Sequence, residues 1–474
     1  MISSSNQILG ELPGTNGPEA REGDPSAPKR NDKLYLNQTE LDAVRFSARS
    51  FLVAAISAFV PAIALSGCGS LWGVSSNITS RSSQAVAATA FTSMLPTAST
   101  WPADYTTLYS FAGGSDGAYP LAGLANGDGT FFGTTFGGGG RSGCDIGDCG
   151  TAFKISPVGQ ETILYRFGAG KDGSNPATRL LYVDGDLYGS TQLGGTGCIS
   201  GCGTVFKIKA ASGRETVVYR FKGAGMRQAA PSPSGLIVVD GNLYGTTFYG
   251  GTGCVDDYCG TVFEISSSGR ESVVHAFKGR PTDGSQPSAG VINVAGSLYG
   301  TTSTGGAYGF GTVFRIGSDG KEKVLYSFSG GSDGKDPEGG LIDVGGVLYG
   351  TTQSGGSDGD GTVYEVDQSG HETVLHQFGG VRDGSLPRAG LINVGGMLFG
   401  TRAFGGAYGQ GVVYQISRSG QETVLYDLMG NYYAYQTHVG LANIGRTLFG
   451  TTSSGGANYC FRGQGCGTVF SIAL

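Results

Sequence analysis

The chain has few charged residues, few histidines and no helical pattern, and each of these absences excludes a class of function or structure. Only 14% of its 474 residues are charged, the formal net charge is −6, and no run of lysine or arginine occurs. Nucleic-acid binding needs a basic patch, so we exclude nucleic acid as a partner. Four histidines do not allow a nucleophile–base–orienter set to be assembled, so we assign no catalytic residue. No segment has helical periodicity, which points to an all-β chain.

Glycine, in contrast, is abundant and sits at fixed places. The 88 glycines recur with a motif of the type Leu-Tyr-Gly-Thr-Thr, followed by Gly-Gly and then Gly-Thr-Val-Phe-x-Ile. The interval between successive copies of this motif is typical of an array of supersecondary units that bury their cores together. Repeated tight turns explain the glycine content better than disorder does. The shared glycine of the motif falls at Gly133, Gly189, Gly245, Gly300, Gly350, Gly400 and Gly450.

Each repeat carries four short strand patterns. In one repeat they are residues 290–294, 298–302, 312–316 and 322–328, rich in β-branched and aromatic residues and bounded by Gly, Asn, Asp and Ser. Such runs predict strands of an antiparallel meander. Seven small sheets of this kind form either an open solenoid or a closed propeller.

The two ends of the array favour the propeller. Residues 106–111 form a lone strand of the fourth type, and residues 467–472 form a strand of the third type. If the ends meet, the first strand completes the last sheet and no edge stays exposed, whereas a solenoid would want dissimilar capping repeats. We therefore predict that residues 105–474 are an all-β, seven-bladed β-propeller of four-stranded antiparallel blades, closed by the N-terminal strand.

The repeat resembles a known family. Its pattern is Glu-Thr-Val-Leu-Tyr-x-Phe, Asp-Gly-x-x-Pro-x-Ala-Gly-Leu-Ile, Leu-Tyr-Gly-Thr-Thr, Gly-Gly and Gly-Thr-Val-Phe-x-Ile, and it is similar to the bacterial choice-of-anchor tandem-repeat family GloVer. The resemblance implies a secreted or surface-attached protein and no established activity. Kelch repeats have a similar length, but their tryptophan is missing, because Trp72 and Trp101 both precede the array.

The segment before the array resembles a bacterial lipoprotein leader. Residues 1–50 read as a disordered or untranslated extension that includes the positive flank of the leader, and Val44 is a candidate true start. Residues 51–67 contain an apolar run of signal-peptide length that ends in Leu-Ser-Gly before Cys68, which resembles a lipobox. Residues 68–104 then read as a lipid-anchored flexible tether. We expect a bacterial cell-envelope protein, anchored at the outer membrane or cell surface, or secreted.

The other eight cysteines fall in pairs, each pair inside one loop between a second and a third strand. Close pairs of this kind indicate local disulfides in an oxidising compartment. Zinc is the rival reading, but each loop offers only two thiols. The four loops with cysteine pairs belong to repeats that would be neighbours on a closed ring. The pairs are Cys144 and Cys149, Cys198 and Cys202, Cys254 and Cys259, and Cys460 and Cys466.

In such a meander the long loops all lie on one face, where binding tends to occur. The repeats without cysteines place aromatic and polar residues there, and the last connection between blades abandons Asp-Gly-x-x-Pro. Aromatic rings beside carboxylates and amides suit a glycan or a protein loop; the alternative is that the rings only cover the blade ends. The ligand-binding candidates are Tyr308, Phe310, Asp358, Asp360, Arg402, Phe404, Tyr408, Gln410, Tyr432, Tyr433, Tyr435 and His438.

Other chemistry is disfavoured. The repeated Asp-Gly (Asp116, Asp172, Asp283, Asp333 and Asp383) is explained by an aspartate that caps its own turn. His275 and His376 take the tyrosine place of a fourth strand, where a structural role is expected. We predict no metal and no cofactor. The function expected is a binding module on the envelope; the alternative is an envelope enzyme that cleaves polysaccharide with Asp358 and Asp360 as acid and base.

Overall fold

The computed structural model describes residues 104–140, 149–168, 170–195, 202–222, 235–251, 254, 259–379, 384–429, 440–460 and 465–474. The chain divides into two compact units, residues 1–92 and 93–474, and every described residue belongs to the second. The extension, the leader, Cys68 and the tether up to residue 103 lie outside the described residues. Within the described part, no helix is long and apolar enough to cross a membrane.

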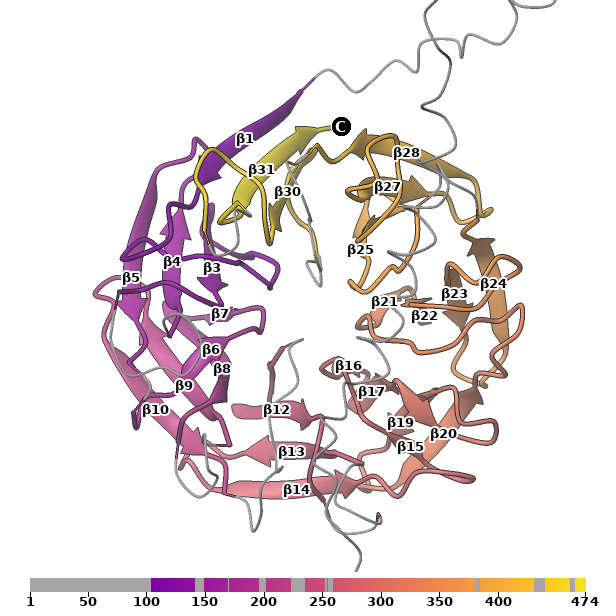
Figure 1. Cartoon of the computed structure of the whole chain (residues 1–474). Coiled ribbons are helices and arrows are strands. Elements are labelled where there is room, and N and C mark those ends of the chain that lie inside the picture. The colour runs from indigo at the N-terminus through magenta and orange to yellow at the C-terminus, as the bar shows by residue number, and fades with distance from the viewer. Residues whose placement is uncertain are drawn as a thin grey trace, which may run out of the picture. The chain divides into compact units, whose positions relative to one another are not determined.

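The second unit is a ring of seven antiparallel sheets with no helix among its described residues (Figure 1). The prediction of an all-β, seven-bladed propeller is confirmed. Blade 1 consists of β2 (Ala125–Gly127), β3 (Thr130–Thr135), β4 (Thr151–Ile155) and β5 (Glu161–Arg166). Blade 2 consists of β6 (Ser174–Pro176), β7 (Leu181–Val183), β8 (Asp186–Leu193), β9 (Thr204–Lys209) and β10 (Glu215–Arg220). Blade 3 consists of β11 (Ile237–Val239), β12 (Asn242–Thr247), β13 (Thr261–Ile265) and β14 (Glu271–Ala276).

The other blades repeat this order. Blade 4 has β16 (Ile292–Val294), β17 (Ser297–Thr302), β19 (Thr312–Ile316) and β20 (Glu322–Ser327), beside the short pair β15 (Gly284–Ser285) and β18 (Thr304–Gly305). Blade 5 has β21 (Ile342–Val344), β22 (Val347–Thr352), β23 (Thr362–Val366) and β24 (Glu372–Gln377). Blade 6 has β25 (Ile392–Val394), β26 (Met397–Arg402), β27 (Val412–Ile416) and β28 (Glu422–Asp427). Blade 7 has β29 (Ala442–Ile444), β30 (Thr447–Thr452), β31 (Thr468–Ala473) and β1 (Tyr105–Ser110).

β1 is the outer strand of blade 7, although it is the first strand of the chain. It pairs antiparallel with β31, Tyr105 opposite Ile472 and Ser110 opposite Thr468 (Figure 1). The register shifts between Thr107 and Tyr109. The outer strands of the other blades shift at the matching place, as β20 does opposite β19. β1 therefore sits against its sheet in the way that the outer strands of the other blades do.

The repeated glycine is required by a ring on the neighbouring strand. Gly300 of β17 lies opposite Phe314 of β19. A Cβ at Gly300 would be 2.6 Å from Cζ of Phe314, closer than any real side chain allows. Phe314 is fully buried and has no room to yield. The same ring, Phe or Tyr, covers the matching glycine in the other six blades.

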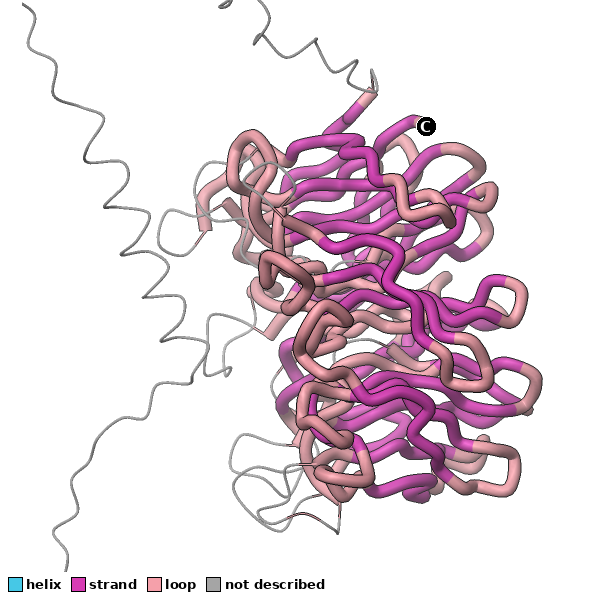
Figure 2. Tube along the Cα trace, turned by 90° about the vertical axis from the view of Figure 1, so that its right-hand side faces the viewer, coloured by secondary structure: helices cyan, strands magenta, loops and turns pink. Residues whose placement is uncertain are grey.

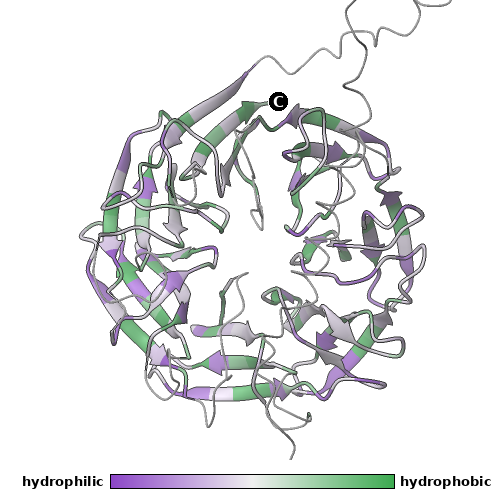
Figure 3. Ribbon diagram, in the orientation of Figure 1, coloured by the Kyte–Doolittle hydropathy of each residue, from purple (hydrophilic) through white to green (hydrophobic). Residues whose placement is uncertain are grey.

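The hydrophobic core lies between neighbouring blades. Hydrophobic and hydrophilic residues alternate along many of the strands (Figure 3), so each sheet presents apolar side chains to its neighbours. At the junction of blades 3 and 4, Phe277 packs edge-on against Phe314 with ring centroids 5.1 Å apart. Matching aromatic pairs join blades 7 and 1, 1 and 2, 2 and 3, 4 and 5, and 5 and 6. The junction of blades 6 and 7 has Leu428 where the others have a phenylalanine.

Candidate functional site

The long loops share one face of the ring. Tight turns join the first and second strands and the third and fourth strands at one end of the blades. The longer loops gather at the other end (Figure 2). Because a rigid scaffold positions loops of this kind, the long-loop face is the first place to look for a binding site.

A cluster of three side chains recurs between blades on the outer side of this face. In one copy Tyr326 ends an outer strand, Asp333 lies in the connection that follows, and Glu372 begins the next outer strand. The Tyr326 hydroxyl donates to Oδ2 of Asp333 at 2.9 Å, and the backbone N–H of Ser329 donates to the same oxygen at 2.6 Å. We call this arrangement the Tyr–Asp–Glu cluster. Its aspartate holds its own connection closed, and Asp116, Asp172 and Asp283 also accept backbone N–H groups of their connections. The capping role predicted for Asp-Gly is confirmed at these four positions, and Asp383 lies outside the described residues.

The glutamate of the cluster is held in a crowded, partly dry place. Burial, and then the charge of Asp333, raise the pKa of Glu372 to about 7. The same two causes raise the pKa of Glu161 and of Glu215 to about 7, with Asp116 and Asp172 as the neighbouring charges. A neutral, protonated glutamate therefore fits the cluster better than an ionised one.

The junction of blades 6 and 7 departs from this pattern. Tyr105 lies opposite Ile472 in the register position that Glu322 has opposite Ile316, so a tyrosine stands where six blades have glutamate. The rings of Tyr105 and Tyr426 are stacked, with centroids 4.0 Å apart and planes 2° from parallel. At this junction a stacked pair of tyrosines therefore replaces the contact between tyrosine and glutamate. The unusual connection at residues 430–439 leads into blade 7 and lies outside the described residues.

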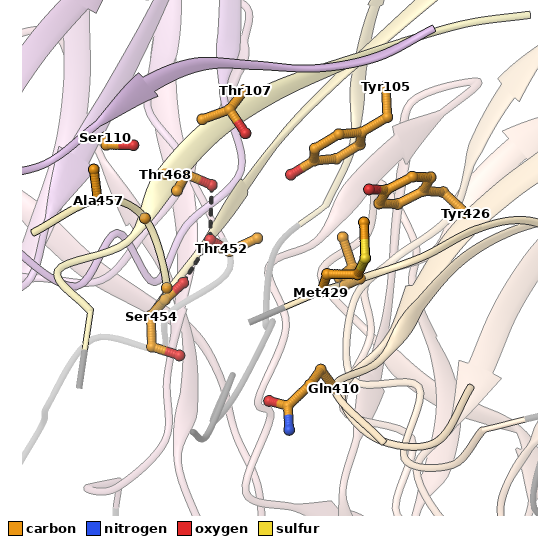
Figure 4. Close-up of a pocket in the computed structure, with 13 residues that line it drawn as sticks. Tyr105, Thr107, Ser110, Gln410, Tyr426, Met429, Thr452, Ser454, Ala457 and Thr468 are labelled. Atoms are coloured by element: carbon orange, nitrogen blue, oxygen red, sulfur yellow. Dashed lines mark hydrogen bonds between the residues drawn. The ribbon is translucent and has the colours of Figure 1, made fainter. Parts of the chain in front are cut away.

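A pocket of about 380 Å³ opens at this junction (Figure 4). The stacked phenols come from β1 and β28, and their hydroxyls point toward the side where Thr452 and Thr468 lie (Figure 4). Thr452 and Thr468 share a hydrogen bond of 2.8 Å. No charged side chain is among the described residues that line it, which are Tyr105, Thr107, Ser110, Gln410, Tyr426, Leu428, Met429, Thr452, Ser454, Gly455, Gly456, Ala457 and Thr468.

The two phenols keep their protons. Burial raises the pKa of Tyr105 and of Tyr426 above the ordinary value. Both hydroxyls can therefore donate as well as accept hydrogen bonds at any physiological pH. Together with the amide of Gln410 and the threonine and serine hydroxyls, they give the pocket neutral polar groups beside the apolar side chains of Leu428 and Met429.

Apart from Arg402, the predicted candidates that the structure describes lie in loops of three blades. Gln410 lines the pocket, and Tyr408 in the same loop is 55% exposed and close enough to Tyr426 to influence its ionisation. Phe404, half-buried, starts this loop, and its backbone pairs with Ser385. Tyr308 and Phe310 are exposed on blade 4, and Asp358 is exposed and Asp360 half-buried on blade 5. Tyr432, Tyr433, Tyr435 and His438 lie outside the described residues.

Arg402 is placed differently from what a surface candidate requires. Its side chain is fully buried and pairs with Glu422. The guanidinium lies over the rings of Phe378 and Tyr414, 4.3 and 4.7 Å from their centroids. In the register of blade 4 this position is Thr302 opposite Thr312, whose hydroxyls bond each other at 2.8 Å. Arg402 opposite Val412 replaces that threonine pair, so its role in the described structure is internal.

Two of the four predicted disulfides lie within the described residues and are confirmed. Cys254 is bonded to Cys259 with Cα atoms 5.9 Å apart, and Cys460 to Cys466 with Cα atoms 5.1 Å apart. Cys149 and Cys202 are also disulfide-bonded, whereas Cys144 and Cys198 lie outside the described residues. The Cys460–Cys466 bridge lies close beside Gly113, in the connection that follows β1.

Sequence reasoning missed most of the pocket. Tyr105, Tyr426 and Met429 look like ordinary members of outer strands and their ends. A signal for Tyr105 was present: aligned on the outer strands of the other blades, its position is otherwise always glutamate (Glu161, Glu215, Glu271, Glu322, Glu372 and Glu422).

A family model described as the Gloeobacter/Verrucomicrobia repeat matches residues 66–280 and 254–470, which agrees with the resemblance seen in the sequence. No curated protein matches the chain.

Solved structures of similar shape are distant in sequence. An oligogalacturonate lyase in complex with manganese has a TM-score of 0.44 at 11% identity, covering 79% of this chain and 94% of that one. A chain of the mitotic checkpoint complex also has a TM-score of 0.44 at 11% identity, covering 87% and 98%. TolB from Acinetobacter baumannii has a TM-score of 0.34 at 15% identity, and the match spans 58% of each chain. Likenesses at this level carry no argument about function.

Proposed function

Because the chain belongs to the Gloeobacter/Verrucomicrobia repeat family, we propose that it is a cell-envelope lipoprotein whose propeller binds a neutral glycan in the pocket between blades 6 and 7. The observation that carries the proposal is that this pocket lies where the repeat is broken. A function confined to one place in an array of repeats requires residues that the other repeats lack. Tyr105, Leu428 and the connection after β28 are such departures.

The chemistry of the lining supports a neutral sugar. Phenol, hydroxyl and amide groups can both donate to and accept from sugar hydroxyls. The apolar side chains and ring edges beside them suit the C–H surfaces of a sugar ring. With no charged group among the described lining residues and a net charge of −6, an acidic polysaccharide would gain no ion pair here and would be repelled at long range.

The envelope location rests on the sequence. Leu65–Cys68 resembles a lipobox, and the disulfides suit an oxidising compartment. Replacing Cys68 with alanine is expected to move the protein from the membrane fraction to the soluble fraction and to abolish incorporation of labelled fatty acid. A Cys68→Ala protein that still carries lipid and stays with the membrane would contradict the anchor.

Binding rather than cleavage is the better reading of the site. Asp358 and Asp360, the acid and base of the enzymatic alternative, do not line the pocket, and Asp358 is exposed. A glycosidase needs two carboxyl groups that flank the scissile bond. We therefore expect glycan binding without the release of reducing sugar.

The test is a glycan array combined with a reducing-sugar assay on three variants. Tyr105→Glu restores the residue of the other six blades and places a charge in the pocket, so we expect neutral-glycan affinity to fall at least tenfold. Gln410→Ala should also weaken binding. Tyr308→Ala, on the exposed loop of blade 4, is the matched control and should bind normally. Loss of binding in Tyr308→Ala alone, or product release by the wild type, would overturn the proposal.

A further inference from the structure

The junction of blades 3 and 4 holds a variant of the Tyr–Asp–Glu cluster in which histidine replaces tyrosine. His275 is near the end of β14, Asp283 lies in the connection that follows, and Glu322 begins β20. Nε2 of His275 is 3.1 Å from Oδ2 of Asp283. One ligand atom from each of the three residues lies within 4.8 Å of the other two. An imidazole nitrogen and two carboxylates at this spacing are a donor set for a metal ion.

The three side chains are held in place by the fold. Asp283 is only 5% exposed, and its two oxygens accept from the backbone N–H groups of Lys278 at 2.9 Å and Gly284 at 2.7 Å. The imidazole of His275 packs edge-on against Phe277, with ring centroids 4.8 Å apart. Such outer contacts orient metal ligands before the ion arrives.

An oxygen of the third residue lacks a partner. Oε1 of Glu322 is buried, and among the described residues it has no hydrogen-bond partner. Two close, partly dry carboxylates repel each other, and a cation between them removes that repulsion.

We propose that His275, Asp283 and Glu322 bind a divalent transition-metal ion of the Zn²⁺ type, with at least one coordination position left to water. The nitrogen donor favours Zn²⁺ over Ca²⁺ or Mg²⁺, which prefer oxygen alone. This inference departs from the sequence-based prediction of no metal, because the sequence does not bring the three residues together. It is independent of the glycan pocket.

The other copies of the cluster explain why one junction is selected. Where tyrosine takes the histidine place, as in Tyr326, burial raises the pKa of the phenol far above its ordinary value, so it does not offer an anionic oxygen. At the junction of blades 5 and 6, His376 is 3.7 Å from Glu422, but that glutamate already pairs with Arg402. The guanidinium of Arg402 supplies at this junction the positive charge that a metal ion would supply.

The chain supplies matched variants for the test. His275→Tyr converts the site to the form found at Tyr109, Tyr165, Tyr219 and Tyr326, so the fold is expected to survive. His376→Tyr is the control at the junction that Arg402 occupies. Lys278→Ala removes an exposed cation whose charge acts on Glu322 and should strengthen Zn²⁺ binding. A merely structural cluster would not respond to Lys278 in this way.

The measurement is calorimetric titration of the oxidised full chain with Zn²⁺, and separately with Ca²⁺, after treatment with a chelator. The expected result is one tight Zn²⁺ site, an affinity at least tenfold lower in His275→Tyr and in Glu322→Gln, and no change in His376→Tyr. Melting temperatures without metal show whether each variant is folded. Zn²⁺ binding that is equal in wild type and His275→Tyr, no Zn²⁺ binding by the wild type, or a preference for Ca²⁺ would overturn the proposal.

Discussion

At the scale of single residues, the blades follow one packing rule with one internal exception. A glycine on the second strand makes room for a buried ring on the third, and beyond it two threonine hydroxyls bond each other across the same strands. In blade 6 the threonine pair is replaced by Arg402 and Val412, and the arginine neutralises Glu422. A buried charge needs its partner, because water does not reach it to compensate.

Replacing Arg402 with methionine is expected to destabilise the protein by about 3 kcal/mol or more, since Glu422, whose side chain is only 10% exposed, would lose the cation that pairs with it. Adding Glu422→Gln should recover part of this loss, because the charge itself is then removed. Chemical denaturation of the wild type, the two single variants and the double variant measures the coupling. Additive effects of the two changes would show that the pair is not the cause.

At the scale of elements, the connection between blades and the start of the next outer strand act as a unit. The aspartate accepts hydrogen bonds from the backbone of its own connection. The tyrosine or histidine forms a hydrogen bond with the aspartate, and the glutamate of the neighbouring outer strand packs beside both. This arrangement favours protonated glutamate. Between pH 4.5 and 7 the folded protein holds protons on Glu161, Glu215, Glu322 and Glu372 that the unfolded chain has lost.

The stability of the propeller is therefore expected to fall as pH rises from about 4.5 to about 7, and to level off above that range. Glu372→Gln removes one of the groups responsible, so the variant should melt higher than the wild type at pH 8 and at about the same temperature at pH 4.5. Thermal unfolding at the two pH values measures these melting temperatures, and each protein at pH 4.5 is the control for the same protein at pH 8. A difference between Glu372→Gln and wild type that is the same at both pH values would contradict the account.

At the scale of the whole molecule, the first strand of the array lies beside the last. The pairing of β1 with β31 gives blade 7 its fourth strand, and β1 also supplies Tyr105, Thr107 and Ser110 to the pocket. The Cys460–Cys466 bridge lies against the connection after β1. Blade 7 and the proposed binding site therefore share the same strand.

Deleting residues 1–110 is expected to abolish cooperative unfolding or to cause aggregation, because β31 would present an unpaired edge. Deleting residues 1–103 leaves β1 in place and should preserve a cooperative transition, which makes it the matched control. Calorimetry and size-exclusion chromatography distinguish the outcomes. A protein without residues 1–110 that melts like the control would show that β1 does not close the ring.

The amino-acid sequence determined the local structure and the number of blades. Turn glycines, alternating apolar residues and cysteines a few positions apart act over short stretches of chain, so the repeat, the all-β class and the two described disulfides were predictable. The sequence also showed where the repeat is interrupted, at Arg402 and in the connection after β28. The structure shows that Arg402 is buried inside the protein and is not part of a surface site. Contacts between blades were decided only by the tertiary structure. Tyr105 contacts Tyr426, and His275 lies beside Glu322, because the packing of the ring decides which outer strands are neighbours. No local sequence pattern encodes how close two residues of different blades come.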